Sequence, residues 1–414
     1  MRELLLLISA ILAQQKRPNV IVILADDLGF NDMPWNNPSI IAPNLAKLAK
    51  SGTIISDMYV QPVCTPSRSA LMTSRYPIRL GLQTSVITAP QPSCLPLDEV
   101  TLADEMKSAG YRTHIVGKWH LGHYCPQCLP QQRGFDTFYG YLTGAEDYYK
   151  KTFCIPLQPG GQAACGYDFY NATDVDYSAN GTYSTYLYRD AVKALITDHQ
   201  QNHQDAPFFL YLPFQSVHYP VEVPANYSDL YPNEKDHTRR TYMGMVTALD
   251  EAVGGIVSHL DAMKMAEDTV IYYTTDNGGL VGAGGRNAPF RGQKATLWQG
   301  GLRVPAFVTG KNVKKGETYS GLMHITDIQM TILDMINHKR TGTKPVDGVS
   351  HWNHFQSRAQ QDGRSKEERS FYLERLQVGQ AVRDEILLNI DHDYVRFNPL
   401  PNLAPYPNPY FNTT

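Results

Sequence analysis

A cysteine and an arginine stand one helical turn apart in the segment Cys64-Thr-Pro-Ser-Arg68. Pro66 favours the first turn of a helix, and the i, i+4 spacing would place the sulfur and the guanidinium on one face. A helix amino terminus attracts anions, and the guanidinium fork matches a tetrahedral oxyanion. The ordinary alternative for a cysteine is a buried thiol or half of a disulfide. The segment makes Cys64 a candidate nucleophile beside an oxyanion site.

Oxygen-bearing side chains follow two apolar runs, as Asp26-Asp27 and as Asp276-Asn277-Gly-Gly. Consecutive strand residues point to opposite faces, so the first pair can reach one ion only if the chain turns, which Leu28-Gly29 permits. The alternatives are a helix cap for the first pair and a plain turn for the second. A cluster of hard oxygens without histidine is typical of calcium or magnesium.

Lysines and histidines supply the remaining candidate groups. In Lys118-Trp-His120 the period of a strand puts the lysine and the histidine on one face. His218 follows another apolar run, and Lys294 lies in Arg-Gly-Gln-Lys. Each has an ordinary alternative: a solvated surface pair for the first two, a hydrogen-bonded core histidine for His218, and a surface lysine for Lys294.

These groups need elements that bring them together, and the apolar runs provide such elements. Four runs predict strands buried on both faces: Asn19–Ala25, His114–Val116, Phe208–Leu212 and Thr269–Tyr273. Helical periodicity lies between them, at Thr101–Ala109 and Thr241–Leu260. The alternation predicts an α/β fold with a mostly parallel sheet, whose ligands bind beyond the carboxyl ends of the strands. Polar candidates follow all four runs at that end.

Composition narrows the class of protein. The chain has 414 residues and a formal net charge of -3, which argues against nucleic acid as a partner. We expect one dominant domain, because no linker or internal repeat divides the chain. Residues 1–13 are typical of a signal peptide, with a buried first helix as the alternative, and no later segment resembles a membrane span. Glycosylation sequons agree with secretory passage; they begin at Asn171, Asn180, Asn226 and Asn412.

Six cysteines would meet an oxidising compartment in that pathway. Cys154 and Cys165 bracket a short Pro/Gly loop and could form a local bridge. The pair Cys125-Pro-Gln-Cys128 could be a metal or redox pair, but no second pair completes a zinc site. Pro126 and Pro130 indicate a loop, so we favour a bridge to a distant cysteine over a redox motif.

Two motifs resemble the signatures of the sulfatase family: Cys64-x-Pro-Ser-Arg68, and the segment Gly110-Tyr-Arg-Thr-His-Ile-Val-Gly-Lys-Trp-His120. The likeness runs from about Val20 to Asn398 and is strongest to the arylsulfatase B branch, the N-acetylgalactosamine-4-sulfatases. It implies an alkaline-phosphatase-like α/β domain over residues 18–375, built on a large mixed sheet flanked by helices. It also implies a small antiparallel carboxyl-terminal subdomain, which we expect to be missing, with residues 376–414 forming an incomplete, loop-rich segment.

The resemblance further implies a sulfuric ester hydrolase that acts on sulfated sugars or aryl sulfates. The formylglycine-generating enzyme would oxidise Cys64 to formylglycine, beside which Arg68 stabilises the hydrated aldehyde. One Ca²⁺ would be held by Asp26, Asp27, Asp276, Asn277 and the modified Cys64. Lys118 and Lys294 would grip the sulfate, His218 would protonate the departing alcohol, and His120 would help to release sulfate. The destination would be the lysosome or the extracellular space.

The resemblance also pairs Cys94 with Cys128 and Cys154 with Cys165, leaving Cys125 over. Two departures from the family pattern are Ser74 in place of a usual glycine and Gln299 in place of a usual glutamate. Two other functions compete with an active sulfatase. One is a catalytically impaired sugar-binding relative, and the other is a phosphodiesterase or phosphonate hydrolase on the same architecture.

Overall fold

The computed structural model describes residues 17–156 and 163–357. The predicted signal peptide, the sequon at Asn412 and the segment 376–414 lie outside the described residues. The described parts of Met1–Ile155 and Cys165–Ser357 belong to one compact unit. A second unit, Pro156–Ala164 with Arg358–Thr414, is almost entirely outside them.

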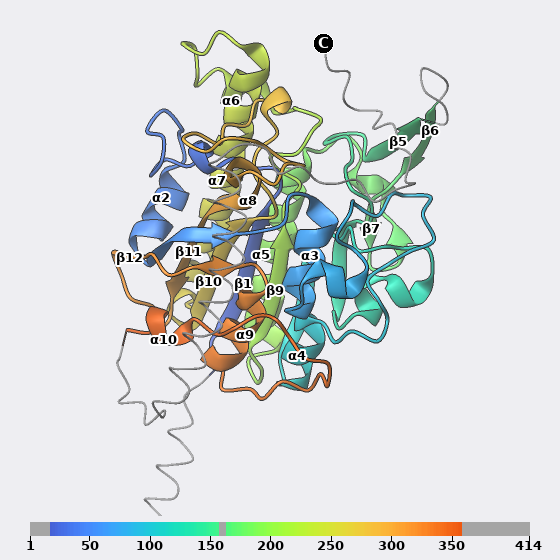
Figure 1. Cartoon of the computed structure of the whole chain (residues 1–414), viewed down its shortest axis with the longest axis vertical. Helices are drawn as coiled ribbons and strands as arrows, with labels where there is room; N and C mark the ends of the chain where they lie inside the picture. The colour runs from blue at the N-terminus through green and yellow to red at the C-terminus, as the bar shows by residue number, and fades with distance from the viewer. Residues whose placement is uncertain (1–16, 157–162, 358–414) are drawn as a thin grey trace, which may run out of the picture. The chain divides into compact units, whose positions relative to one another are not determined.

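An 11-stranded mixed sheet forms the centre of the compact unit (Figure 1). Its order is β12-β2-β11-β10-β1-β9-β3-β4-β7-β8, and β13 pairs with β2. Strands β10, β1, β9, β3 and β4 run parallel, whereas β11 is antiparallel to both of its neighbours. The bounds are β1 Asn19–Ala25, β2 Thr53–Tyr59, β3 Arg112–Lys118, β4 Thr137–Tyr141, β7 Tyr170–Asn171, β8 Asp174–Val175, β9 Phe208–Pro213, β10 Thr269–Thr275, β11 Arg303–Gly310, β12 Glu317–Tyr319 and β13 Met323–His324.

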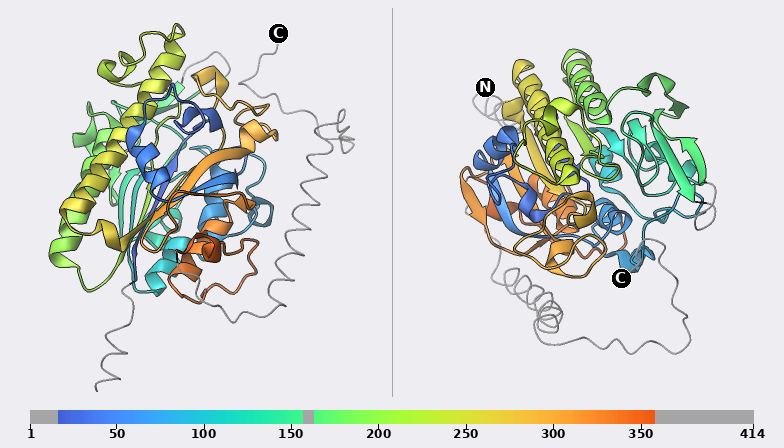
Figure 2. Two further views of the ribbon diagram at one scale, coloured as in Figure 1. Left: turned by 90° about the vertical axis from the view of Figure 1, so that its left-hand side faces the viewer. Right: turned by 90° about the horizontal axis from the view of Figure 1, so that it is seen from above.

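Strand β1 shows why the middle of the sheet has the sequence of a continuous apolar run. All seven of its residues are buried, and alternate side chains enter two different cores. Val20, Val22 and Leu24 pack with α3 (Cys64–Thr73), α4 (Leu102–Ser108) and α9 (Asp327–Met335). Ile21, Ile23 and Ala25 pack with α2 (Pro43–Lys50), α5 (Ser184–Asn202) and α7 (His237–Ala262). Helices therefore cover both faces, as Figure 2 shows.

Local capping fixes where these helices begin. The Thr101 side chain accepts from the Asp104 backbone and completes a capping box at α4. The Asp236 carboxylate accepts from the first turn of α7. Inside α7, Asp250 accepts from the backbone N–H groups of Asn44 and Leu45 and so caps α2 from another helix. These bonds satisfy N–H groups that have no partner within their own helix.

The predicted strands and helices are confirmed within β1, β3, β9, β10, α4 and α7. Shorter helices are α6 (Ala225–Ser228), α8 (Gln299–Leu302) and α10 (Trp352–Phe355). Strands β5 (Thr152–Pro156) and β6 (Ala163–Tyr167) form a separate two-stranded sheet. The disulfides Cys154–Cys165 and Cys94–Cys128 are both present, which confirms the two expected pairings.

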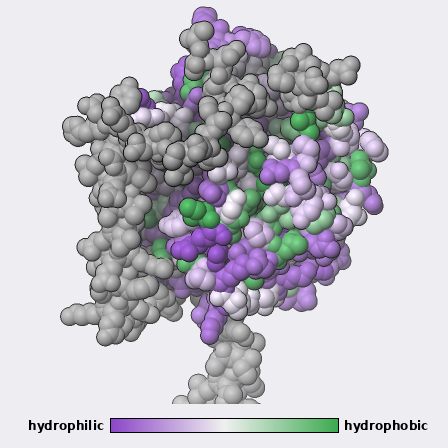
Figure 3. Space-filling model, turned by 45° about the vertical axis from the view of Figure 1, so that its right-hand side comes forward, coloured by the Kyte–Doolittle hydropathy of each residue, from purple (hydrophilic) through white to green (hydrophobic). Residues whose placement is uncertain are grey.

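Apolar side chains are scattered among polar ones on the described surface that is visible in Figure 3. Scattered apolar residues are normal on a folded domain and need no partner. Among the described helices, none has an apolar stretch long enough to cross a bilayer.

Candidate active site

The carboxyl ends of β1, β3, β9 and β10 meet the amino end of α3, and the predicted site residues gather there. Parallel strands end at one edge of a sheet, so residues distant in sequence become neighbours. Most of the group is fully buried, while His218 and Lys294 retain partial exposure. The group comprises Asp26, Asp27, Cys64, Arg68, Lys118, His120, His218, Asp276, Asn277 and Lys294.

A turn at Asp27 lets two consecutive carboxylates serve one site. Asp26 continues the ladder between β1 and β9, since its N–H donates to Ser216 and its carbonyl accepts from Val217. Asp27 then takes a left-handed φ of 58°, which few residues other than glycine adopt. The predicted turn thus falls on Asp27 itself, one residue before the Leu28-Gly29 pair. As a result, one ligand atom from each of Asp26, Asp27, Cys64 and His218 lies within 4.8 Å of the others.

Three cations lie against these carboxylates: Arg68 and Lys118 are fully buried, and Lys294 is partly exposed. Lys118 Nζ donates to Asp26 at 2.6 Å, and Lys294 Nζ lies 2.7 Å from Asp27. The Arg68 guanidinium donates to Asp276 Oδ2 through Nε at 3.0 Å and Nη2 at 2.8 Å, and approaches Asp26 at 3.3 Å. Three positive charges therefore balance three carboxylates inside the protein.

This balance sets the protonation of the two consecutive carboxylates. Burial opposes the ionisation of Asp26, but Lys118, His218 and Arg68 outweigh it and hold its pKa below the ordinary value. Burial also opposes the ionisation of Asp27, and Lys294 and His218 together hold its pKa low. The same attraction raises the pKa of Lys294 despite the cost of burying its charge. Both carboxylates and Lys294 are consequently charged at neutral pH.

Cys64 begins α3 and faces this charged group. Its Sγ lies 3.7 Å from Asp26 Oδ1, and only 1% of the residue is exposed. Burial raises the pKa of the Cys64 thiol to about 12, although Lys118 and Lys294 act in the opposite direction. A thiol of this pKa is protonated at neutral pH, and a protonated thiol is a poor nucleophile. The position is well placed for attack, but the sulfur is not activated for it.

The two histidines present different nitrogens to their surroundings. His218 Nδ1 donates to the Tyr219 carbonyl at 2.5 Å, because a carbonyl can only accept, which leaves Nε2 facing Asp27 at 3.7 Å. His120 Nε2 donates to the Ile87 carbonyl at 3.1 Å, and its Nδ1 is buried without a hydrogen-bond partner among the described residues. Burial is the largest cause of the lowered pKa in both rings; nearby cations, led by Lys118 for His120 and by Lys294 for His218, lower it further.

The oxygen donors fit a hard divalent cation. Asp26 and Asp27 belong to a set of metal-ligating groups that also holds Cys64 and His218. Asn277 donates to Asp27 at 2.7 Å through its amide nitrogen, while its Oδ1 is buried and accepts no hydrogen bond from any described residue. A buried oxygen without a donor is rare and calls for a cation or water. Asp276 is turned toward Arg68 and stands outside that set.

Several positioning residues carry no signal in the sequence. The Tyr242 hydroxyl lies 3.0 Å from both the Asp27 carbonyl and Asp32 Oδ2, and it can donate its one proton to either of them. Asp32 also pairs with Arg239 at 2.6 Å. Thr65 Oγ1 donates to the His120 carbonyl at 3.1 Å. No local pattern marks these residues, because each acts through a partner far away along the chain.

Ser74, one of the two departures from the family pattern, ends α3 in a left-handed conformation with φ 58°. Glycine is the usual residue at such a helix end, because it adopts this conformation without steric cost. The Ser74 hydroxyl donates to the Thr326 carbonyl at 2.8 Å, which helps to hold the strained backbone.

Comparisons with known proteins agree on one family. The sequence model of the sulfatase family matches residues 18–338. Arylsulfatase J of Mus musculus is 42% identical over 343 residues, or 82% of this chain and 56% of that protein. Arylsulfatase A of Homo sapiens is 33% identical over 319 residues, or 74% of this chain and 61% of that protein. The chain therefore spans little more than half the length of arylsulfatase J.

Solved structures extend the comparison to the fold. The crystal structure of Ps i-CgsB in complex with k-i-k-neocarrahexaose is 32% identical, with a TM-score of 0.75, and the match covers 81% of this chain and 76% of that one. Phosphonate monoester hydrolase SpPMH from Silicibacter pomeroyi, at 19% identity and a TM-score of 0.60, shares the fold. The arylsulfatase B branch stays a prediction, but the coarser conclusion is firm: this chain belongs to the sulfatase family.

Proposed function

We propose that this chain hydrolyses sulfate esters of sugars, at a Ca²⁺ site with Cys64 converted to formylglycine. One observation carries the proposal: Lys118, Lys294 and Arg68 converge on the buried end of α3 at Cys64. Buried cations at a helix amino terminus favour a tetrahedral oxyanion over a neutral substrate. The ammonium groups of Lys118 and Lys294 would hold sulfate oxygens, while Arg68, whose fork is bound to Asp276, would stabilise the hydrated aldehyde.

Two groups would complete this site. Asp26, Asp27, Asp276 and Asn277 would hold Ca²⁺, which supplies positive charge to offset the charge that develops on the sulfate. Formylglycine at position 64 supplies an oxygen nucleophile in its hydrated form, in place of the protonated thiol. The carboxylates already accept hydrogen bonds from Lys118, Lys294 and Arg68, so their oxygens would be shared between these cations and the metal.

The histidines would move protons at defined atoms. His218 Nε2 is its one nitrogen not committed to the Tyr219 carbonyl, so this atom would give a proton to the departing alcohol. His120 Nδ1 is likewise free among described groups, so this atom would take or hold a proton while sulfate is released. The Tyr148 hydroxyl donates to the His218 backbone carbonyl at 3.0 Å and so helps to position the backbone of this residue.

The proposed substrate is a sulfated glycosaminoglycan sugar such as N-acetylgalactosamine 4-sulfate. Relatives support a sugar sulfate, since N-acetylgalactosamine-6-sulfatase of Mus musculus is 32% identical over 370 residues, or 84% of this chain and 69% of that protein. The proposed setting is the secretory pathway, with a lysosomal or extracellular destination. There the formylglycine-generating enzyme would act on Cys64.

The decisive experiment measures activity and the state of Cys64 on one secreted sample. Trypsin releases residues 51–68, and the intact mass of this peptide distinguishes an aldehyde from a thiol. Release of the inorganic ion, sulfate or phosphate, is then measured on N-acetylgalactosamine 4-sulfate, its 6-sulfate isomer, and the 4-phosphate ester of the same sugar. We expect the aldehyde, turnover of the sulfate esters and a strong preference for the 4-sulfate.

Matched variants make the result interpretable. Cys64→Ala should abolish turnover, whereas Cys125→Ser, which removes the other free cysteine, should retain it. Full activity with an unmodified thiol would refute the proposed nucleophile. Binding of the sulfated sugar without turnover in aldehyde-containing protein would indicate an impaired relative, and preferential cleavage of the phosphate ester would indicate the phosphoester hydrolase.

A further inference from the structure

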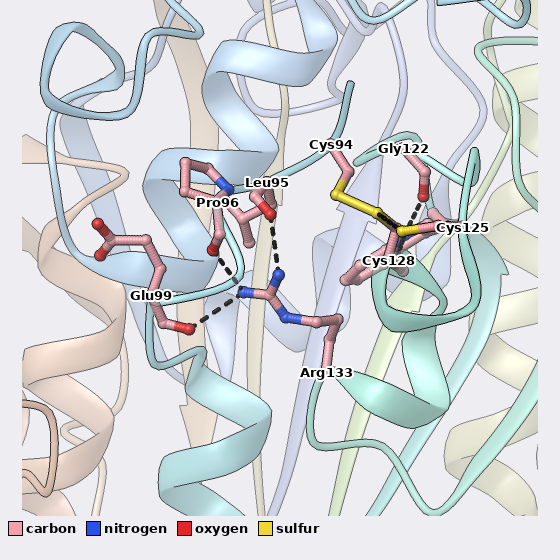
Figure 4. The surroundings of a disulfide bond; sticks show 9 residues. Cys94, Leu95, Pro96, Glu99, Gly122, Cys125, Cys128 and Arg133 are labelled. Atoms are coloured by element: carbon pink, nitrogen blue, oxygen red, sulfur yellow. Dashed lines mark hydrogen bonds between the residues drawn. A yellow bond between two sulfur atoms is a disulfide. The ribbon is translucent and has the colours of Figure 1, made fainter. Parts of the chain in front are cut away.

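Three sulfur atoms meet where the loop that follows β3 contacts the segment that contains Cys94. Cys94 and Cys128 form a disulfide across a sequence separation of 34. The free thiol of Cys125 lies 3.2 Å from Cys128 Sγ. Figure 4 shows Cys125 beside the Cys94–Cys128 disulfide. A third sulfur in contact with a disulfide is not needed for cross-linking, so its chemistry requires an explanation.

The geometry is that of a thiol facing a disulfide sulfur that it can attack. A near-attack arrangement requires reacting atoms about 3–3.5 Å apart, and the distance between the Cys125 and Cys128 sulfurs falls in this range. Cys125 directly precedes η3, a short 3₁₀ helix at Pro126–Cys128. The two sulfurs are therefore held on one short loop. Cys125 is partly exposed and follows Tyr124, which is 52% exposed. Solvent can therefore take up the thiol proton.

We propose that Cys125 exchanges with the Cys94–Cys128 disulfide, so that the folded chain has two disulfide isomers. The Cys125 thiol gives its proton to solvent, and its sulfur forms a bond to Cys128 Sγ. The Cys94–Cys128 bond breaks with its electron pair on Cys94, which takes up a proton. One disulfide and one thiol exist before and after, so no oxidant or reductant is required.

The rest of the sequence keeps this exchange local. The other cysteines are Cys154 and Cys165, which are bonded to each other, and Cys64, which is buried at the candidate active site. Three sulfurs in one cluster cannot all pair, so one thiol always remains. Exchange decides whether that thiol is on the loop after β3 or on the segment that contains Cys94.

The disulfide joins two segments that meet beside His120. Gly122 approaches Cys94 so closely that a Cβ at this glycine would lie 2.2 Å from the Cys94 Cβ. Arg133 holds the chain after Cys94 independently, by donating to the carbonyls of Leu95 and two later residues (Figure 4). Exchange therefore breaks the covalent link between the two segments while Leu95 stays bound to Arg133. It loosens the segment before Cys94. This segment contains Ile87, whose carbonyl accepts a hydrogen bond from His120.

Tryptic mapping under non-reducing conditions tests the proposal, because the two isomers give different peptides. Residues 80–107 contain Cys94, and residues 119–133 contain both Cys125 and Cys128. The first isomer gives these two peptides cross-linked, and the second gives them separate, with an internal disulfide in 119–133. The full chain is incubated at about pH 8.5, near the ordinary pKa of a thiol, then acidified and labelled with N-ethylmaleimide. We expect label on Cys94 to rise as label on Cys125 falls, one for one.

Two variants make the test decisive. Cys125→Ser removes the attacking sulfur, so Cys94 should stay unlabelled throughout the same incubation. Cys94→Ser should give an internal disulfide in peptide 119–133, and two labels on that peptide would show that the pair cannot bond. The proposal is overturned if wild-type Cys94 never gains label, or if Cys125 is found bonded to a second chain or to a small thiol. None of these readouts depends on sulfatase activity.

Discussion

The ion pair between Arg239 and Asp32 lies beneath the turn that carries Asp27, and its removal should destabilise the fold in a defined way. The two side chains are 2% and 0% exposed, with 2.6 Å between Nη1 and Oδ1. Arg239→Met keeps much of the side-chain volume and removes the charge. Asp32 would then keep two neutral donors, the Tyr242 hydroxyl and the Arg286 backbone N–H.

The expected loss follows from leaving a carboxylate buried without its cation. Removing one partner of a buried pair lowers the free energy of unfolding by about 3–5 kcal/mol. Because Asp32 would keep two hydrogen bonds, we expect a loss at the lower end of this range, about 3 kcal/mol. Burial already raises the pKa of Asp32 even though Arg239 acts against it. Without Arg239 this pKa rises further. A raised pKa favours folding of the protonated form, so the deficit should shrink as the pH falls toward it.

Urea denaturation followed by tryptophan fluorescence measures the effect, at about pH 7 and about pH 5. A double-mutant cycle with Asp32→Asn separates the charge interaction from changes in packing. We expect a coupling energy of about 2 kcal/mol, with the double variant more stable than Arg239→Met alone. A loss below about 0.5 kcal/mol, with additive effects and no pH dependence, would refute an energetic role for this pair.

Two other predictions concern protons and metal. Burial lowers the pKa of His114 to about 4, so its contribution to stability is complete above about pH 6.5 and is lost as the pH falls toward 4. This loss amounts to about 3 kcal/mol, and His114→Gln should flatten that part of the profile of urea midpoint against pH. Calcium at about 100 times its dissociation constant should raise the free energy of unfolding by about 2.7 kcal/mol. Asp27→Ala should abolish the corresponding rise in melting temperature, and an equal rise in this variant would place the ion elsewhere.

Much of the fold follows from patterns within single segments. Strands buried on both faces need no polar alternation, so β1, β3, β9 and β10 stand out as apolar runs. The polar residues behind them meet because parallel strands end at one edge of the sheet. For this reason the amino-acid sequence is enough to assign Asp26, Lys118 and His218 to one site.

Contacts between distant segments leave no comparable signal. Asp32 and Arg239 are 207 residues apart, and a single charge in a sequence resembles any solvated charge. Strand β11 has no recognisable pattern either, because Pro305 interrupts it; the register of its pairing with β2 shifts between Val304 and Ala306 at this proline. The sulfur contact of Cys125 depends on the turn at Pro126, which spacing alone does not determine.

Cys64 is closed off once the protein has folded. All ten residues of α3 are buried, and Cys64 as a whole is 1% exposed. An enzyme that modifies this residue needs access to its backbone as well as its sulfur, and so must act before α3 packs against the sheet. Under the proposed conversion of Cys64 to formylglycine, modification and folding would therefore compete in time. A substitution that speeds the packing of α3 would then lower the fraction of chains that acquire the aldehyde, without changing any residue of the site.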